Sequence, residues 1–178
     1  MTHAACGRPL QGRTALVTGA TRGLGKGIAV ALAKAGAAVY FTGRTVNEFE
    51  GTPLPGSLAQ TEQAIRDAGG FGLAIRCDHT DEAQTQNAVD TVVRDRGRID
   101  ILVNNVWGGY EYYSDGTPFW EERGFWDAPA SRYDNMMAAG VRAHYMTSRF
   151  AVPHMLDAGG AIFNLFFWAA DETDKGVA

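Results

Sequence analysis

A glycine-rich turn between a strand pattern and a helix pattern limits the fold of this chain more than any other feature. Residues 14–18 form a short apolar run that is typical of a buried strand, and residues 18–25 read TGATRGLG. From residue 23 to residue 35 the apolar positions recur at helical spacing, and Gly36 is a natural stop. A strand, a glycine turn and a helix in this order are typical of sheets of parallel strands.

The same alternation of strand and helix patterns continues along the 178 residues. No linker, internal repeat or low-complexity tract divides the chain, so the pattern predicts one doubly wound α/β domain. Further strands are expected at 38–42, 71–77, 99–103 and 161–167. Further helices are expected at 57–68 and from an N-cap at Thr80 to about Gly97. A last, long helix is expected from a capping box at 131–134 to about residue 156, with a bend at Pro153.

Each glycine of the turn has a distinct expected purpose. Gly19 lets the chain turn tightly off the strand, Gly23 permits close backbone approach to a pyrophosphate, and Gly25 lets the helix pack against the sheet. Phosphates would then lie on the free N–H groups at the amino end of the helix. An ordinary tight turn is the alternative, but the position between a strand and a helix favours a nucleotide site.

The end of the second expected strand bears on which nucleotide would bind. NAD sites place an acid there for the ribose 2′-hydroxyl, whereas arginines accommodate a 2′-phosphate. Residues 40–44 read YFTGR, with no acid, and Arg22 in the glycine turn adds a second cation to Arg44. Two guanidinium groups can bind one phosphate, and the alternative is two solvated surface arginines. The pattern favours NADP over NAD, and it disfavours an S-adenosylmethionine methyltransferase, whose site also has an acid at this position.

The charge balance excludes other classes of function. With 16 basic and 20 acidic residues the net charge is −4, which argues against a nucleic-acid-binding protein. The longest apolar run, 161–170, is about half the length that a membrane-spanning helix needs. Cys6 and Cys77 are too few for a disulfide framework or a zinc site, and the four histidines do not cluster at metal-ligand spacing. A cytoplasmic protein without a membrane segment or a metal site is expected.

Three segments together resemble the short-chain dehydrogenase/reductase family. They are the glycine turn at 18–25, CDHTD at 77–81 and GRIDILVNN at 97–105. The resemblance implies a Rossmann-type sheet of five parallel strands in the order 3-2-1-4-5. The domain so defined spans 13–170, between an N-terminal tail at 1–12 and a C-terminal tail at 171–178.

The resemblance also implies how NADP is held. Asp78 is expected to contact the adenine ring, with the backbone of His79 beside it. Asn104 and Asn105 are expected to support the fourth strand and border the ribose. The expected cofactor-binding residues are Gly19, Thr21, Arg22, Gly23, Leu24, Gly25, Arg44, Asp78, His79 and Asn105.

The catalytic positions of the family do not carry their usual residues. Its members use a tyrosine acid/base, a lysine that lowers the tyrosine pKa, a serine and an asparagine. The asparagine position falls at Gly140 and the serine position at Phe167, and neither residue can do that chemistry. The Tyr-x-x-x-Lys motif and the C-terminal helix and strands of the family lie beyond the 178 residues, so the chain is interpreted as truncated and no catalytic residue is assigned. Tyr145 and Lys175 are rejected as substitutes because they belong to the long helix and the tail.

The function implied by the resemblance is hydride transfer between NADP(H) and an alcohol or carbonyl compound. This chain is expected to bind the cofactor but to be inactive alone, and a non-catalytic NADP-binding or scaffold protein is the alternative. Residues 107–127 hold eight aromatic side chains and are interpreted as a substrate-pocket wall, a small local core or a subunit contact. The apolar residues of 163–168 are expected to be poorly covered, which favours association, and a homo-oligomer is a candidate assembly.

Overall fold

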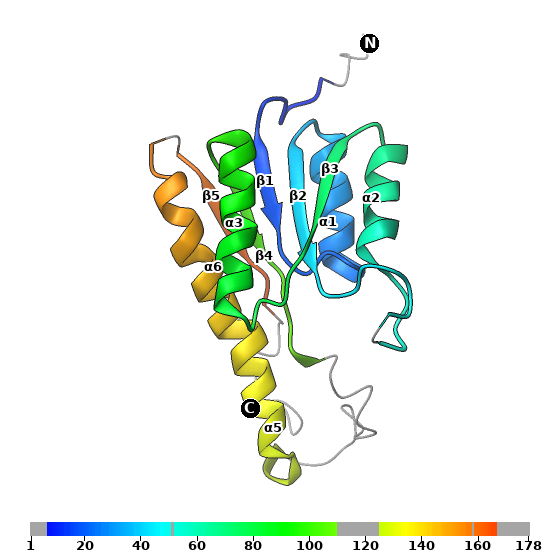
Figure 1. Cartoon of the computed structure of the whole chain (residues 1–178), viewed down its shortest axis with the longest axis vertical. Coiled ribbons are helices and arrows are strands. Elements are labelled where there is room, and N and C mark those ends of the chain that lie inside the picture. The colour runs from blue at the N-terminus through cyan, green and yellow to red at the C-terminus, as the bar shows by residue number, and fades with distance from the viewer. Residues whose placement is uncertain (1–6, 51, 110–124, 158, 167–178) are drawn as a thin grey trace, which may run out of the picture.

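Five parallel strands form the centre of the computed structural model, which describes residues 7–50, 52–109, 125–157 and 159–166. The strand order is β3-β2-β1-β4-β5, as predicted (Figure 1). β1 is central, with Leu16 aligned between Tyr40 of β2 and Leu102 of β4. The strands are β1 (Thr14–Val17), β2 (Ala38–Gly43), β3 (Phe71–Arg76), β4 (Ile101–Asn104) and β5 (Ala161–Asn164).

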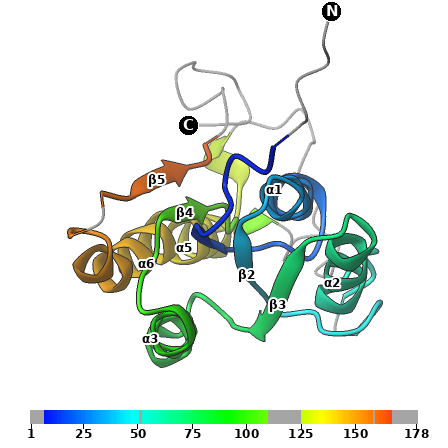
Figure 2. The same ribbon diagram turned by 90° about the horizontal axis from the view of Figure 1, so that it is seen from above.

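Helices cover both faces of this sheet. On one face lie α1 (Gly23–Lys34) and α2 (Leu58–Asp67), and on the other lie α3 (Glu82–Arg96) and α6 (Ala143–Ala151), as Figure 2 shows. The doubly wound fold expected from the alternating pattern is therefore confirmed. In the part of the chain that the structure describes, no helix is long and apolar enough to cross a membrane.

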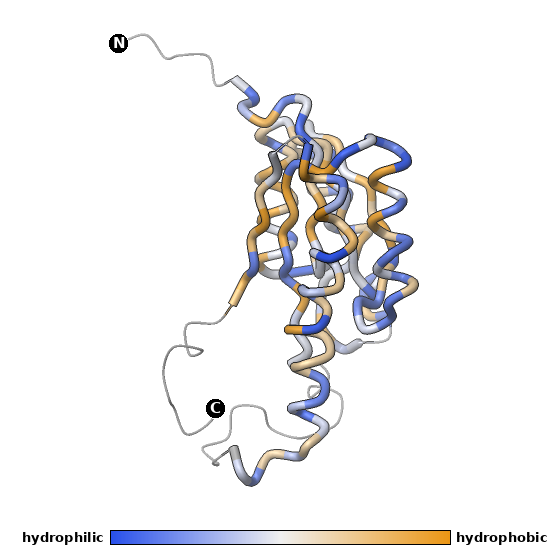
Figure 3. Tube along the Cα trace, turned by 90° about the vertical axis from the view of Figure 1, so that its left-hand side faces the viewer, coloured by the Kyte–Doolittle hydropathy of each residue, from blue (hydrophilic) through white to orange (hydrophobic). Residues whose placement is uncertain are grey.

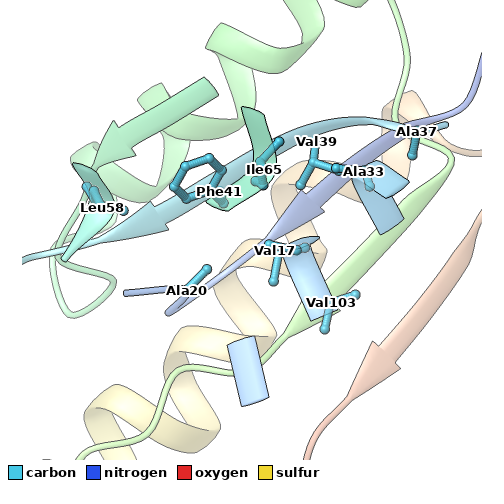
Figure 4. Packing of buried hydrophobic residues seen from close by; sticks show 11 residues of the cluster. Val17, Ala20, Ala33, Ala37, Val39, Phe41, Leu58, Ile65 and Val103 are labelled. Atoms are coloured by element: carbon cyan, nitrogen blue, oxygen red, sulfur yellow. The ribbon is translucent and has the colours of Figure 1, made fainter. Parts of the chain in front are cut away.

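Alternate residues of the central strands supply two separate cores. Val17 and Phe41 pack with Ile65 of α2 on one face (Figure 4), whereas their neighbours Leu16 and Tyr40 pack on the face covered by α3. Apolar residues therefore gather along the strands in Figure 3. A strand that is buried on both faces has a continuous apolar run, which is the pattern that made these strands predictable.

The predicted N-cap of α3 is wrong by one residue. The carboxylate of Asp81, not the hydroxyl of Thr80, accepts hydrogen bonds from the N–H groups of Ala83 and Gln84, at 2.9 and 3.1 Å. Thr80 instead donates its hydroxyl proton to the carboxylate of Asp78 at 2.8 Å. The charged carboxylate is the better partner for the positive end of the helix, so it takes the capping position.

The long helix is not the single bent helix that was predicted. It consists of α5 (Ala130–Met136), the π-helical segment η3 (Met137–Arg142), α6 and the 3-10 turn η4 (Val152–His154), and α5 projects past the end of the sheet in Figure 1. The capping box at 131–134 is wrong, because the N-cap is Pro129, whose φ of −64° already suits a helix. The α-helix ends at Ala151 because Pro153 has no N–H with which to continue it.

The edge strand β5 is shorter than predicted and exposes apolar side chains. It ends at Asn164, and Phe163 and Phe166 are 54% and 76% exposed, in agreement with the expected poor cover. Leu165 departs from that expectation, because it is partly buried against the core that contains Val17. The expectations for Phe167 and Trp168 lie outside the described residues.

Candidate cofactor-binding site

A cavity of about 560 Å³ lies at the carboxyl ends of β1 to β4. In doubly wound sheets this edge is where ligands bind, next to the strand at which the order reverses. The structure brings all ten residues expected to bind a cofactor together around this one cavity. They are Gly19, Thr21, Arg22, Gly23, Leu24, Gly25, Arg44, Asp78, His79 and Asn105.

The glycine turn has a backbone that only glycine adopts easily. Gly19 and Gly23 have φ angles of 68° and 54°, in the left-handed region. A Cβ atom at Gly25 would overlap the carbonyl oxygen of Gly19 and the side-chain amide of Asn105. The turn is therefore closed by contact between backbone groups, which brings the amino end of α1 against the sheet.

Asn105 fastens the glycine turn to the end of β4. Its backbone N–H donates to Thr18 Oγ1 at 2.9 Å, and its Nδ2 donates to the carbonyl oxygens of Thr18 at 3.1 Å and Gly19 at 2.8 Å. The resemblance implied a place beside the ribose, and Asn105 does line the cavity. The bonds to the turn give it a further part in shaping the site, which the sequence pattern did not reveal.

Asn104 supports β4 from within the core. Its side chain is fully buried, and Nδ2 donates to Ser148 Oγ at 2.9 Å and to Asn164 Oδ1 at 2.8 Å. These bonds join β4 to α6 and β5. The support of the fourth strand that the resemblance implied is thus present in the geometry.

The amino end of α1 has features that favour a bound anion. Arg22 is its N-cap and makes no side-chain capping bond, and the first turn contains no acid. In contrast, Ser57 caps α2 and Asp81 caps α3 with side-chain oxygens. Helix N–H groups that are not satisfied by a cap, together with the positive end of the helix dipole, favour a bound phosphate.

Three arginines line the cavity where β2 and β3 end. Nη2 of Arg22 lies 3.4 Å from Thr45 Oγ1 and 3.3 Å from the carbonyl oxygen of Gly56, which holds this guanidinium against the loop that follows β2. Arg44 is exposed directly after β2, and Arg76 is the last residue of β3. Arg76 was missed from the sequence, although the parallel alignment of the strand ends would have placed it beside Arg44.

His79 is buried beneath the cavity and was expected there only through its backbone. Its side chain is 3% exposed, and Nε2 lies 2.7 Å from Thr42 Oγ1. Thr42 Oγ1 also accepts from the N–H of Gly19 at 3.3 Å, so the hydroxyl proton of Thr42 is directed to Nε2 of His79. Through Thr42, the imidazole thereby supports Gly19, the first glycine of the turn.

The other ring nitrogen of His79 faces two helices. Nδ1 lies 3.3 Å from the hydroxyl oxygens of Thr85 and Thr147, which donate their own protons to helix carbonyls. Nδ1 must therefore be the protonated nitrogen of a neutral ring. The pKa of His79 is lowered to about 4, mainly by burial; the nearby Asp78 opposes this shift and His144 adds to it.

Cys77 and Asp78 follow β3 at the floor and rim of the cavity. Burial raises the pKa of the Cys77 thiol to about 12, which agrees with an inert core thiol. Asp78 is half-buried, and its carboxylate accepts from the N–H of Thr80 at 3.0 Å and from its hydroxyl. This carboxylate is held at the rim, where the resemblance places the adenine ring.

The family's catalytic positions are only partly described. Gly140 lies in the π-helical segment η3 and carries no side chain, while Phe167 and Lys175 lie outside the described residues. Tyr145 is exposed on α6 and does not line the cavity. Of the aromatic segment 107–127, Trp107 lines the cavity, and positions 110–124 lie outside the described residues. Among the described lining residues there is no tyrosine and no lysine.

A parallel sheet in the order 3-2-1-4-5, with a glycine turn and an uncapped helix at its reversal point, defines a Rossmann-type α/β protein. More particularly, the chain belongs to the short chain dehydrogenase family, whose family model matches residues 13–173.

Curated relatives support this assignment. Mouse (Mus musculus) Dehydrogenase/reductase SDR family member 1 is 36% identical over 152 residues, which cover 85% of this chain and 44% of the relative. Hydroxysteroid dehydrogenase-like protein 2 of Danio rerio is 35% identical over 147 residues, which cover 83% of this chain and 32% of the relative. The chain therefore spans less than half the length of these two proteins.

Solved structures agree with the fold and differ in their cofactor. A metagenomic short-chain oxidoreductase in complex with NADP is 29% identical with a TM-score of 0.76, and the match covers 96% of this chain and 69% of the other. A 7α-hydroxysteroid dehydrogenase complexed with NADH and 7-oxo glycochenodeoxycholic acid is 27% identical with a TM-score of 0.76, covering 98% of this chain and 61% of the other. These two solved relatives thus hold different forms of the nicotinamide cofactor.

Proposed function

We propose that this chain binds NADP(H) in the 560 Å³ cavity, for hydride transfer between an alcohol and a carbonyl compound. The observation that carries the proposal is the arrangement around the reversal point of the sheet, where the uncapped amino end of α1 meets Arg22, Arg44 and Arg76. The pyrophosphate would lie on the N–H groups of α1, and the 2′-phosphate would lie among the arginines.

The residues present fit this cofactor. Gly23 leaves the turn open to close backbone approach, Asp78 offers a carboxylate at the expected adenine position, and no acid follows β2 directly. When bound, the nicotinamide supplies the hydride donor or acceptor, and the residues of this chain bind and orient it. Because the described lining contains no tyrosine or lysine, we propose that the 178 residues hold the cofactor without turning over a substrate.

Replacing Arg44 with glutamine tests the preference for the 2′-phosphate. We expect the variant to bind NADPH about tenfold more weakly while its affinity for NADH is unchanged, because only NADPH carries the group that a guanidinium would hold. Fluorescence titration of the reduced nicotinamide measures both affinities. Arg66→Gln, an exposed arginine on α2 away from the cavity, is the matched control and should leave both unchanged. Equal affinity of the unaltered protein for NADPH and NADH would contradict the proposal.

Turnover is tested separately on the intact 178-residue chain. We expect NADPH to bind and its absorbance to remain constant when a panel of aliphatic and aromatic aldehydes and ketones is added. Mass spectrometry of the same sample verifies that the chain has its stated length. A steady oxidation of NADPH that depends on a carbonyl compound would overturn the proposed inactivity, and it would leave the binding proposal standing.

A further inference from the structure

A second cavity, of about 470 Å³, lies at the opposite edge of the sheet. Its lining includes the first residues of three neighbouring strands, Thr14 of β1, Ala38 of β2 and Phe71 of β3. Because the strands are parallel, this edge is the far end from the cavity at the glycine turn, and it lies at the top of Figure 1. Its volume lies in the range of about 300–1,000 Å³ that is usual for small-molecule sites.

Four arginines line this amino-end cavity, namely Arg8, Arg13, Arg96 and Arg98, and its described lining contains no acid. The chain as a whole has more acidic than basic residues, 20 against 16, so this local excess of positive charge runs against the overall balance. Such an excess around a concave surface attracts anions.

One buried carboxylate neutralises only part of this charge. Asp100 accepts a hydrogen bond from Nη1 of Arg13 at 2.8 Å and another from Arg98, so two guanidinium groups share one acid. Their side chains remain 49% and 41% exposed, which leaves them accessible to a ligand. The Nε of Arg98 is buried and has no hydrogen-bond partner in the described part of the chain.

The other two arginines form no ion pair with a described residue. Nη2 of Arg8 donates to the carbonyl oxygen of Gly69 at 2.9 Å. Nε of Arg96 donates to the hydroxyl oxygen of Tyr40 at 3.1 Å, and its guanidinium lies 4.5 Å from the centre of the Phe71 ring. Stacking on an aromatic ring orients a guanidinium without neutralising it.

The ends of the helices account for only part of this set of arginines. The carboxyl ends of α1, α2 and α3 lie at this edge, and cations such as Arg96, the last residue of α3, are often found there because the helix dipole is negative. The last carbonyls already have backbone donors, however: those of Ala33 and Ile65, for example, accept from Gly36 and Gly70 at 3.0 Å each. Arg8 extends this capping through its bond to Gly69, and Arg96 suits the end of α3, whereas Arg13 and Arg98 belong to no helix end.

We propose that the amino-end cavity binds a small phosphate-bearing anion. The guanidinium groups of Arg8 and Arg96 form no ion pair with an acid of the described chain, although Asp95 shares the Tyr40 hydroxyl with Arg96, and Arg13 and Arg98 add the surplus left by Asp100. Guanidinium forks match the geometry of phosphate oxygens, and the exposed ring of Phe71 gives the ligand an apolar wall. The site is separate from the proposed NADP(H) cavity and does not depend on it.

Inorganic pyrophosphate is the probe for this site, in calorimetric titrations at low ionic strength. We expect the double variant Arg8→Gln/Arg96→Gln to bind it about tenfold more weakly than the unaltered protein. The double variant Arg66→Gln/Arg94→Gln removes the same charge from exposed positions outside the cavity and should bind like the unaltered protein. Equal affinities of the two double variants, or no binding by the unaltered protein, would overturn the proposal.

Two further measurements keep the test independent of folding and of the cofactor cavity. In the unaltered protein, amide NMR shifts caused by pyrophosphate are expected at Gly12, Gly36 and Gly70, which line the amino-end cavity. Shifts confined to Gly19 and Gly23 would place the anion in the cofactor cavity alone and would overturn the proposal. Titration of Arg22→Gln should retain the shifts at the amino-end cavity, whatever happens to NADPH binding.

Discussion

Replacing Gly25 with alanine is expected to lower the free energy of unfolding by about 1–3 kcal/mol. The added Cβ would overlap the carbonyl oxygen of Gly19 and the Nδ2 atom of Asn105. Both atoms are fixed, because the amide of Asn105 is itself bonded to the carbonyls of Thr18 and Gly19. The structure can relieve the overlap only by moving α1 away from the glycine turn, so we also expect NADPH to bind at least tenfold more weakly.

Gly27→Ala is the matched control for this prediction. Gly27 lies on the same helix, two residues further on, and a Cβ atom there would meet no atom within 4 Å apart from the neighbouring backbone of α1. Alanine at an exposed helix position is favoured over glycine by about 0.5–1 kcal/mol, so this variant should be slightly more stable than the unaltered protein. Urea unfolding of the three proteins, followed by circular dichroism, measures the difference. If Gly25→Ala were as stable as Gly27→Ala, the close packing inferred for the turn would be wrong.

The fold and the outline of the cofactor cavity could be predicted because both depend on local patterns. A buried parallel strand has an apolar run, and a tight turn onto a helix requires glycine at positions such as Gly19 and Gly23. The order of the strands followed from the resemblance, and the paired registers confirm it. The ten expected site residues gather around one cavity because the carboxyl ends of parallel strands meet at one edge.

What could not be predicted depends on contacts between distant segments. Asn105 donates hydrogen bonds to residues that precede it by more than eighty positions, and no rule of sequence spacing predicts such a bond. Arg76 enters the cavity only because β3 lies beside β2 in a particular register. The cavity at the amino ends of the strands joins Arg8 to Arg96, and periodicity does not reveal such a pair. The π-helical segment around Gly140 likewise has no proline or other local signal.

Below about pH 6.5, His79 is expected to make the folded protein progressively less stable. Burial lowers its pKa to about 4 from the ordinary value of 6.5, so between these values the unfolded chain binds a proton that the folded chain does not. The free energy of unfolding that the neutral ring contributes is fully present above pH 6.5 and decreases as the pH falls below that value. The decline is at most about 1.4 kcal/mol per pH unit for one proton, or about 3 kcal/mol over the whole interval.

His79→Gln should remove this contribution to the pH dependence. An amide side chain does not titrate, so the loss of unfolding free energy between pH 7 and pH 4.5 should be smaller than in the unaltered protein by about 2.5 kcal/mol. The variant should be less stable at pH 7, because an amide cannot satisfy Thr42, Thr85 and Thr147 together with the geometry of an imidazole. Urea unfolding at both pH values measures the two effects separately.

His154, in η4, supplies the control because it does not contact Thr42, Thr85 or Thr147. His154→Gln should keep most of the loss of unfolding free energy between pH 7 and pH 4.5. His144 will also lower the stability as the pH falls, because burial lowers its pKa as well. The contribution of His79 is therefore measured as the difference in pH dependence between the unaltered protein and His79→Gln. Protonation of His79 would turn Nε2 into a second donor toward Thr42 Oγ1, so the hydroxyl proton of Thr42 would lose its acceptor and the bond from the N–H of Gly19 to this oxygen would be disturbed. NADPH binding near pH 4.5 should therefore weaken more in the unaltered protein than in His79→Gln. An equal weakening in both proteins would show that the buried imidazole does not support the glycine turn.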